Sequence, residues 1–168
     1  MPNKKIVFLD IDGVLNSDRT YPTLPYADQW KLLKIDPAAL VHFNRIARLA
    51  SVVVSSSWRW EYTPADLRIV LLRHGLDPTI PFIGSTSRAL ELDVDGIEAP
   101  NRGQEILDWL SMHPDVTNYV ALDDGPDLAQ LGHHFVRTTH ERGLEEQHVV
   151  AALYALDLPW SHALTFGN

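Results

Sequence analysis

Short apolar runs alternate with segments of helical periodicity along the chain, and this alternation restricts the fold more than any other feature. The runs at residues 5–9 (KIVFL), 52–54 (VVV) and 118–122 (NYVAL) lack the polar alternation of half-exposed strands, which is typical of strands covered on both faces. Strands that alternate with helices imply right-handed βαβ units. The sequence therefore predicts an α/β fold, a Rossmann-like parallel sheet with helices on both faces.

Capping residues and apolar spacing predict the remaining elements. Asp36 followed by Pro37 is typical of a helix start, because aspartate caps backbone N–H groups and proline is tolerated in the first turn. The further expected elements are, in chain order, a helix over residues 38–49, a helix from 64 to Gly75, a weak strand over 81–84, a helix over 102–112, a strand over 134–138 and a helix over 144–156.

Charge and composition exclude several classes of function. The 22 acidic and 14 basic residues give a net charge of −8. Non-specific nucleic-acid binding rests on many contacts between phosphates and Lys or Arg, so this charge argues against binding along a long polyanion but permits recognition of one phosphate. The chain has no cysteine, which excludes a thiol nucleophile, a disulfide scaffold and a thiolate metal site.

No apolar run approaches the roughly 20 residues that a membrane-spanning helix needs, so we expect no membrane partner. The basic pair at residues 4–5 is followed by only four apolar residues before Asp10, which is too short for a secretory signal. We therefore expect a cytoplasmic protein.

Each of the three apolar runs ends in a polar cluster. These clusters are residues 10–13 (DIDG), 55–57 (SSS) and 123–127 (DDGPD). The carboxyl ends of parallel strands meet at one edge of the sheet, where ligands bind in such folds. Five carboxylates at one edge repel each other unless a cation lies among them, and oxygen ligands favour Mg²⁺. The predicted Mg²⁺ ligands are Asp10 and Asp123, with Asp124 or Asp127 acting directly or through water.

The same clusters suggest a phosphoryl-transfer site. Asp10 can attack a phosphorus atom as an anionic nucleophile, and Asp12 can act as general acid and then as general base. Gly13 lets backbone amides approach the phosphate. Arg102, at the start of a predicted helix, is the candidate cation for the charge on the transferring group, with Lys34 and Arg59 as alternatives.

The four motifs together resemble the haloacid dehalogenase-like (HAD) superfamily, and within it the small HAD domains of RNA-repair proteins. The motifs are FLDIDGVLN (residues 8–16), VVVSSSW (52–58), the helix NRGQEILDWL that contains Arg102, and VALDDGPD (120–127). The resemblance implies a phosphatase or phosphotransferase, because the dehalogenases of this superfamily lack an acid at the position of Asp12. It also implies that the backbone carbonyl of Asp12 binds the metal and that Ser56, or Ser55 in the alternative register, binds phosphate.

We expect one domain over residues 1–168 with a minimal cap, because no insert is long enough for a separate cap domain. The Pro- and Tyr-rich segment 17–34 is a candidate for a small flap or lid. An open site suits a phosphate on a large substrate, such as a nucleic-acid end, whereas a flap could shield a small phosphorylated metabolite. The sequence does not distinguish these two classes of substrate, and it does not indicate the oligomeric state.

Two further alternatives concern residues 58–62 (WRWEY) and the class of function. Trp58 and Trp60 could stack on a base while Arg59 binds a phosphate, or the tryptophans could pack in the core or in a lid. A non-catalytic phosphate-binding module is the alternative to an enzyme. A receiver-like signalling domain is disfavoured, because it needs a lysine at a late strand end and the last lysine here is Lys34.

Overall fold

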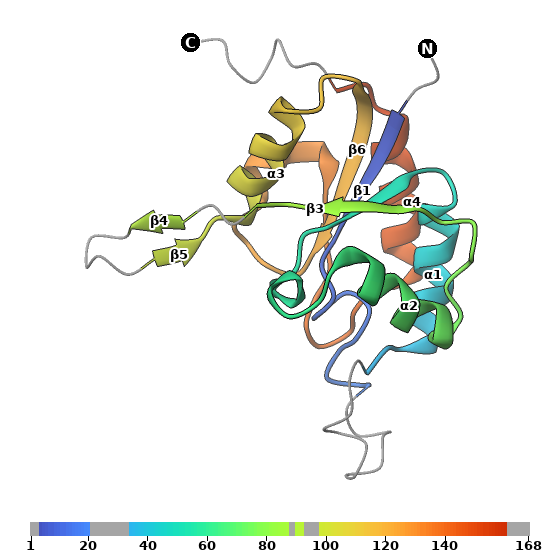
Figure 1. Cartoon of the computed structure of the whole chain (residues 1–168). Helices are drawn as coiled ribbons and strands as arrows, with labels where there is room; N and C mark the ends of the chain where they lie inside the picture. The colour runs from blue at the N-terminus through green and yellow to red at the C-terminus, as the bar shows by residue number, and fades with distance from the viewer. Residues whose placement is uncertain (1–3, 21–33, 88–89, 93–97, 161–168) are drawn as a thin grey trace.

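The computed structural model describes residues 4–20, 34–87, 90–92 and 98–160 (Figure 1). Five parallel strands form one sheet in the order β3-β2-β1-β6-β7. This arrangement confirms the predicted α/β, Rossmann-like fold. The strands are β1 (Lys4–Leu9), β2 (Ser51–Val54), β3 (Phe82–Ser85), β6 (Val116–Asp123) and β7 (Phe135–Arg137).

Of the four helices in the described residues, three connect strands and the fourth follows β7, and their ends follow the capping signals. The side chain of Asp36 accepts a hydrogen bond from the backbone N–H of Ala38, and Thr63 forms a capping box with Asp66. Gly75 ends the second helix with a φ of 106°. The helices are α1 (Pro37–Ala47), α2 (Pro64–His74), α3 (Arg102–Ser111) and α4 (Glu146–Asp157), with 3₁₀ turns η3 (Ser57–Trp60) and η4 (Ala129–His134).

The two faces of the sheet bury separate apolar clusters. Val7 and Leu9 of β1 point to one face, which α1, α2 and α4 cover, whereas Ile6 and Phe8 point to the other, which α3 and η4 cover. Figure 1 shows α3 on the side of the sheet opposite α1 and α4. Side chains therefore alternate between two cores along the central strand, as a doubly covered strand requires.

Several boundaries differ from the prediction. The last helix begins at Glu146, two residues later than expected, and β6 begins at Val116, two residues earlier. The predicted strand at 134–138 is β7, shorter by one residue at each end. Thr117 and Asn118 separate Val116 from the apolar run that follows, so the pairing of β6 with β1 decides where the strand begins.

A short antiparallel ribbon that the sequence did not predict precedes α3. It consists of β4 (Leu90–Leu92) and β5 (Glu98–Pro100), and Figure 1 shows it projecting away from the main sheet. Its three-residue strands are too short for apolar periodicity to identify them. The ribbon lies in the interval between β3 and α3.

The candidate flap at residues 17–34 lies mostly outside the described residues, which omit 21–33. Its first part is held in place, since the backbone N–H of Asp18 donates to the carbonyl of His140 over 2.9 Å. Among the described residues, no helix is long and apolar enough to cross a membrane.

Candidate active site

The register of the sheet brings the three polar clusters together. Leu9 of β1 pairs with Val54 of β2 on one side and with Leu122 of β6 on the other. Asp10, Ser55 and Asp123 each follow one of these residues and so lie in one row at the carboxyl edge. They continue the alternation of Phe8, Val53 and Ala121, whose side chains lie on the face that α3 covers. This places the row beside the first residue of α3, which is Arg102.

Asp10 is a buried carboxylate in an unusual electrostatic setting. Its side chain is 7 % exposed, and its backbone N–H donates to the carbonyl of Leu122 over 3.0 Å. Burial and the neighbouring charge of Asp123 raise the pKa of Asp10 to about 7, against the lowering effects of Arg102 and of a hydrogen bond from Ser56. An ionised Asp10 therefore needs additional positive charge nearby.

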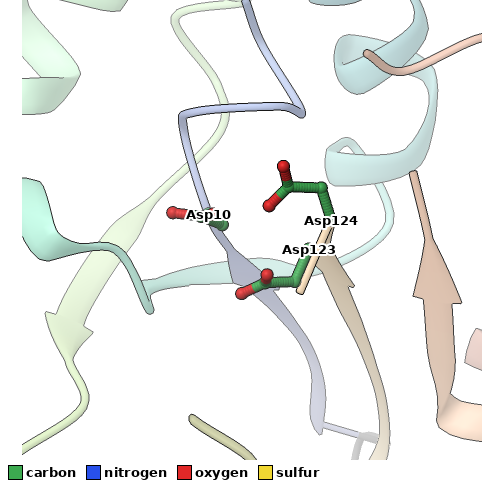
Figure 2. Close-up of side chains that lie close together, drawn as sticks. All are labelled: Asp10, Asp123 and Asp124. Atoms are coloured by element: carbon green, nitrogen blue, oxygen red, sulfur yellow. The ribbon is translucent and has the colours of Figure 1, made fainter. Parts of the chain in front are cut away.

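Three carboxylates form a cluster that could hold a metal ion. Ligand atoms of Asp10, Asp123 and Asp124 lie within 4.8 Å of one another, and Figure 2 shows their side chains beyond the carboxyl ends of β1 and β6. Burial raises the pKa of Asp123 to about 6, and its Oδ2 atom is buried without a hydrogen bond. An orphaned buried carboxylate oxygen in an all-oxygen donor set fits a divalent cation.

Asp12 and Asp127, the other two predicted metal ligands, place their carboxylates elsewhere. One oxygen of Asp127 accepts a hydrogen bond from the backbone N–H of Arg102 over 3.0 Å, so Asp127 caps α3. The carboxylate of Asp12 is hydrogen-bonded to Asn16 and Trp58. The cluster of three therefore includes neither side chain.

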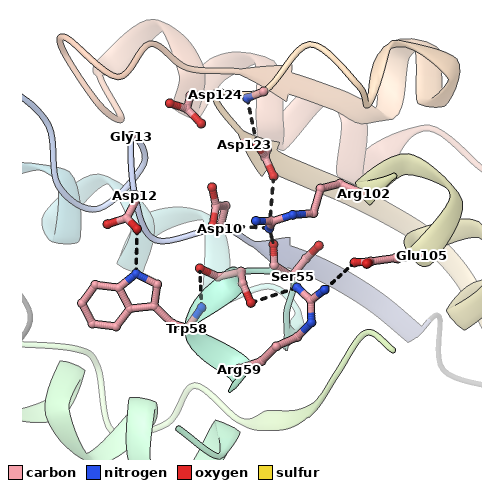
Figure 3. A network of polar contacts seen from close by, with 12 residues as sticks. Asp10, Asp12, Gly13, Ser55, Trp58, Arg59, Arg102, Glu105, Asp123 and Asp124 are labelled. Atoms are coloured by element: carbon pink, nitrogen blue, oxygen red, sulfur yellow. Dashed lines mark hydrogen bonds and ion pairs between the residues drawn. The ribbon is translucent and has the colours of Figure 1, made fainter. Parts of the chain in front are cut away.

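Arg102 brings its guanidinium close to Asp10. Its Nη1 atom lies 3.6 Å from Asp10 Oδ1 and 3.8 Å from Asp123 Oδ2, and it donates to the backbone carbonyl of Ser55 (Figure 3). The side chain is 16 % exposed, so its charge acts across a partly desolvated gap. Of the candidate cations, Arg102 is thus placed against the acidic cluster.

Ser55 and Ser56 face different surroundings. The hydroxyl of Ser56 accepts a hydrogen bond from the backbone N–H of Trp58 and interacts with Asp10. The hydroxyl of Ser55 is buried without a hydrogen-bond partner, and the backbone N–H of Ser55 donates to Leu9 within the sheet. Of the two serines, Ser56 is the one that interacts with Asp10.

Asp12 is fixed by donors from two different loops. Its Oδ1 accepts from Asn16 Nδ2 over 2.8 Å, and its Oδ2 accepts from the indole Nε1 of Trp58 over 2.7 Å (Figure 3). Asn16 also accepts, through Oδ1, a hydrogen bond from the backbone N–H of Gly13. The turn after β1 is therefore tied together by one buried asparagine side chain.

A sequence model of one protein family, described as "HAD domain in Swiss Army Knife RNA repair proteins", matches residues 6–149 of the 168. The chain belongs to this family. The matched span includes every residue of the site described above. Membership in the HAD family supports a phosphohydrolase of the HAD type and a divalent metal at the acidic cluster. No match to the chain was found among curated proteins or among solved structures.

Arg59 lies in a buried ion pair of this HAD domain rather than at the acidic cluster. Its Nη2 donates to Glu105 Oε2 over 2.7 Å and its Nη1 to the carbonyl of Ser56 over 2.8 Å. The side chains of Arg59 and Glu105 are 5 % and 0 % exposed. The pair joins η3 to α3, and the two hydrogen bonds occupy both terminal nitrogens of Arg59, whose phosphate contact stays a prediction.

Sequence reasoning missed several residues that shape the HAD site. Asn16 and Glu105 received no role, although both are buried polar residues near motif acids. Thr138 donates from Oγ1 to the carbonyl of Gly13 over 2.6 Å, and His140 Nδ1 lies 3.2 Å from Asp124 Oδ2. The terminal Asn of FLDIDGVLN was visible in the motif, whereas the other contacts depend on tertiary structure.

Proposed function

We propose that this protein is a Mg²⁺-dependent phosphohydrolase that forms an aspartyl-phosphate on Asp10. The observation that supports this most strongly is the placement of one buried carboxylate, Asp10, against Arg102 and in a cluster with two further carboxylates. In an aspartate with only a structural role this arrangement would disfavour the ionised carboxylate, since burial and repulsion raise its pKa. A nucleophile that meets phosphate and metal there gains charge complementarity on binding.

In the first step, an oxygen of Asp10 attacks the phosphorus atom and the bond to the leaving oxygen breaks. Arg102 stabilises the negative charge on the transferring group, and the Ser56 hydroxyl is in place to donate to a phosphoryl oxygen. Bound Mg²⁺, held by Asp10, Asp123 and Asp124, would neutralise the carboxylates and the phosphate. These groups together convert an acidic edge into a phosphate-binding site.

Asp12 completes the reaction as general acid and then general base. It gives its proton to the leaving oxygen when the phosphorus–oxygen bond breaks, and it then takes a proton from the water that hydrolyses the aspartyl-phosphate. Its carboxylate is hydrogen-bonded to Trp58 and Asn16, two uncharged donors. Asp12 therefore stands apart from the three clustered carboxylates.

For the substrate, we propose a terminal phosphate of a nucleic acid. The family description refers to RNA-repair proteins, and the net charge of −8 is compatible with one phosphate at a chain end but not with extended backbone contacts. A small phosphorylated metabolite is the alternative, and a substrate panel distinguishes the two. Turnover of oligonucleotides with 3′- or 5′-phosphates supports the proposal, whereas turnover of sugar phosphates alone contradicts it.

Hydrolysis of p-nitrophenyl phosphate with and without Mg²⁺ tests the reaction class. We expect activity that requires the metal and that falls by about a thousandfold or more in Asp10→Asn. Asp108→Asn is the matched control, because Asp108 is exposed on α3 and its carboxylate contacts Gln104. Unchanged metal-dependent hydrolysis by Asp10→Asn would contradict the proposed function.

A further inference from the structure

Trp58 donates hydrogen bonds through both of its N–H groups, one to Asp12 and one to Ser56. The indole Nε1–H donates to Asp12 Oδ2 over 2.7 Å, and the backbone N–H donates to the Ser56 hydroxyl over 3.4 Å. Ser56 in turn interacts with Asp10. One residue from the loop after β2 therefore connects the acid/base to the serine beside the nucleophile.

The Trp58 ring is itself fixed from several directions. It packs against the apolar core under α1, α2 and α4, and its centroid lies 5.9 Å from the ring of Tyr62. The backbone carbonyl of Trp58 accepts hydrogen bonds from the N–H groups of Glu61 and Tyr62. A ring held in this way presents its N–H at one place, and it has little freedom to swing out and stack on a base.

We propose that Trp58 is a positioning residue whose indole N–H holds the carboxylate of Asp12 for proton transfer. This inference rests on the proposed function, since it gives Trp58 a role only if Asp12 is the acid/base. Asn16 fixes one carboxylate oxygen from the same loop, and Trp58 fixes the other from a loop 46 residues away. Two donors on opposite oxygens define the plane of the carboxylate, which neither donor alone defines.

The chemistry of the leaving group separates positioning from simple stability. When the phosphorus–oxygen bond breaks, the proton on Asp12 moves to the leaving oxygen, and the electron pair of the broken bond stays on that oxygen. A poor leaving group such as phenolate needs this proton, whereas dinitrophenolate leaves without it. Loss of the indole N–H should therefore slow the first substrate much more than the second.

The experiment compares Trp58→Phe with the wild-type protein on phenyl phosphate, p-nitrophenyl phosphate and dinitrophenyl phosphate. We expect kcat/KM to fall by roughly 10- to 100-fold for phenyl phosphate and by less than about threefold for dinitrophenyl phosphate. Trp60→Phe is the matched control, because Trp60 lies on the same 3₁₀ turn and is 57 % exposed. An equal loss on all three substrates would overturn the inference.

A double-mutant cycle gives a second readout that a merely structural role would not produce. In an Asp12→Asn background the general acid is absent, so Trp58→Phe should cause little further loss of kcat/KM on phenyl phosphate. Additive losses would mean that Trp58 acts independently of Asp12, and the inference would be wrong. A different result, undiminished hydrolysis by Asp10→Asn, would contradict the proposed function itself, so the two failures are distinguishable.

Should Trp58→Phe fail to fold, Asn16→Ala removes the other donor to Asp12 from a different element. The inference then requires the same selective loss on phenyl phosphate, because each donor alone leaves the carboxylate plane undefined. Asn16 also accepts from the backbone N–H of Gly13, so part of the loss is common to all three substrates, and the absence of an additional loss on phenyl phosphate would contradict the inference.

Discussion

The carboxylate of Asp124 lies directly against the α-carbon of Gly13. A Cβ atom on residue 13 would come within 2.3 Å of Asp124 Oδ2, and the φ of Gly13 is 73°, in the left-handed region. The glycine of the first motif thus makes room for a carboxylate of the third motif. This contact links the turn after β1 to the candidate metal cluster at the end of β6.

Gly13→Ala should therefore damage the metal cluster as well as the backbone. We expect a loss of stability of about 1–2 kcal/mol from the left-handed conformation, together with displacement of Asp124 and weaker Mg²⁺-dependent activity. Gly75→Ala is the control, since its φ is 106° and no atom lies within 4 Å of the added Cβ. That control should lose stability in urea unfolding and keep its activity, and equal activity in both variants would contradict the predicted clash.

Arg59→Ala should strongly destabilise the fold, because it leaves Glu105 buried without its charged partner. Removal of one member of a buried ion pair costs about 3–5 kcal/mol. The exposed pair of Lys4 and Asp115, whose side chains are 33 % and 58 % exposed, provides the comparison. Asp115→Asn should change the free energy of unfolding far less, because solvent screens an exposed pair. Similar values for the two variants, measured by urea unfolding, would show that the buried pair contributes no more than a surface pair.

Mg²⁺ should stabilise the wild-type protein against thermal unfolding, and Asp123→Asn should lose most of this stabilisation. A ligand at about 100 times its Kd adds about 2.7 kcal/mol to the free energy of unfolding. Asp127→Asn should keep the effect, because Asp127 lies outside the cluster of three and contacts the backbone N–H of Arg102. Thermal shifts with and without Mg²⁺ measure this stabilisation. An equal loss in both variants would mean that Asp127 also binds the metal.

The raised pKa values of Asp10 and Asp123 should make the metal-free protein less stable as the pH rises. The ordinary pKa of both groups is 3.8, and the folded values are about 7 and about 6. Between these limits the folded protein binds more protons than the unfolded chain, so the free energy of unfolding decreases with pH. The contribution is fully present below the unfolded value and is lost as the pH rises through the folded values.

A variant isolates this effect from other titrating groups. The lowered pKa values of His134 and His148, caused by burial, act in the opposite direction as the pH rises. Urea unfolding in a chelator at about pH 5 and about pH 8 should therefore be compared between the wild type and Asp10→Asn. The wild type should lose more stability over this interval, and parallel pH dependence would show that the Asp10 pKa is not raised.

The central features of the fold and site follow from local sequence signals. Buried runs followed by polar clusters predict a parallel sheet, and the register of β1 with β2 and β6 then brings Asp10, Ser55 and Asp123 into one row. No knowledge of distant contacts was needed for that step. Arg102 occupies the first helical position of α3 because the preceding residue, Asn101, caps this helix with a side chain that accepts from the backbone N–H of Gln104.

The contacts that orient the site depend on pairs far apart in the chain. Trp58 reaches Asp12 across 46 residues, and Arg59 reaches Glu105 across another 46. A tryptophan beside apolar residues and a glutamate on a helix have ordinary explanations in the sequence alone, and only tertiary packing shows which polar atoms they meet. The ribbon of β4 and β5 escaped prediction for a different reason, because three-residue strands have no periodicity to detect.

Direct detection of the covalent intermediate tests the central claim, that Asp10 is the nucleophile. The protein is mixed with Mg²⁺ and a phosphate ester that contains radioactive phosphorus, quenched in acid within the first turnover, digested and analysed by mass. The account predicts label on the peptide that contains Asp10, sensitive to hydroxylamine as an acyl phosphate is, and none in Asp10→Asn. Full hydrolytic activity with no label on that peptide would contradict the account.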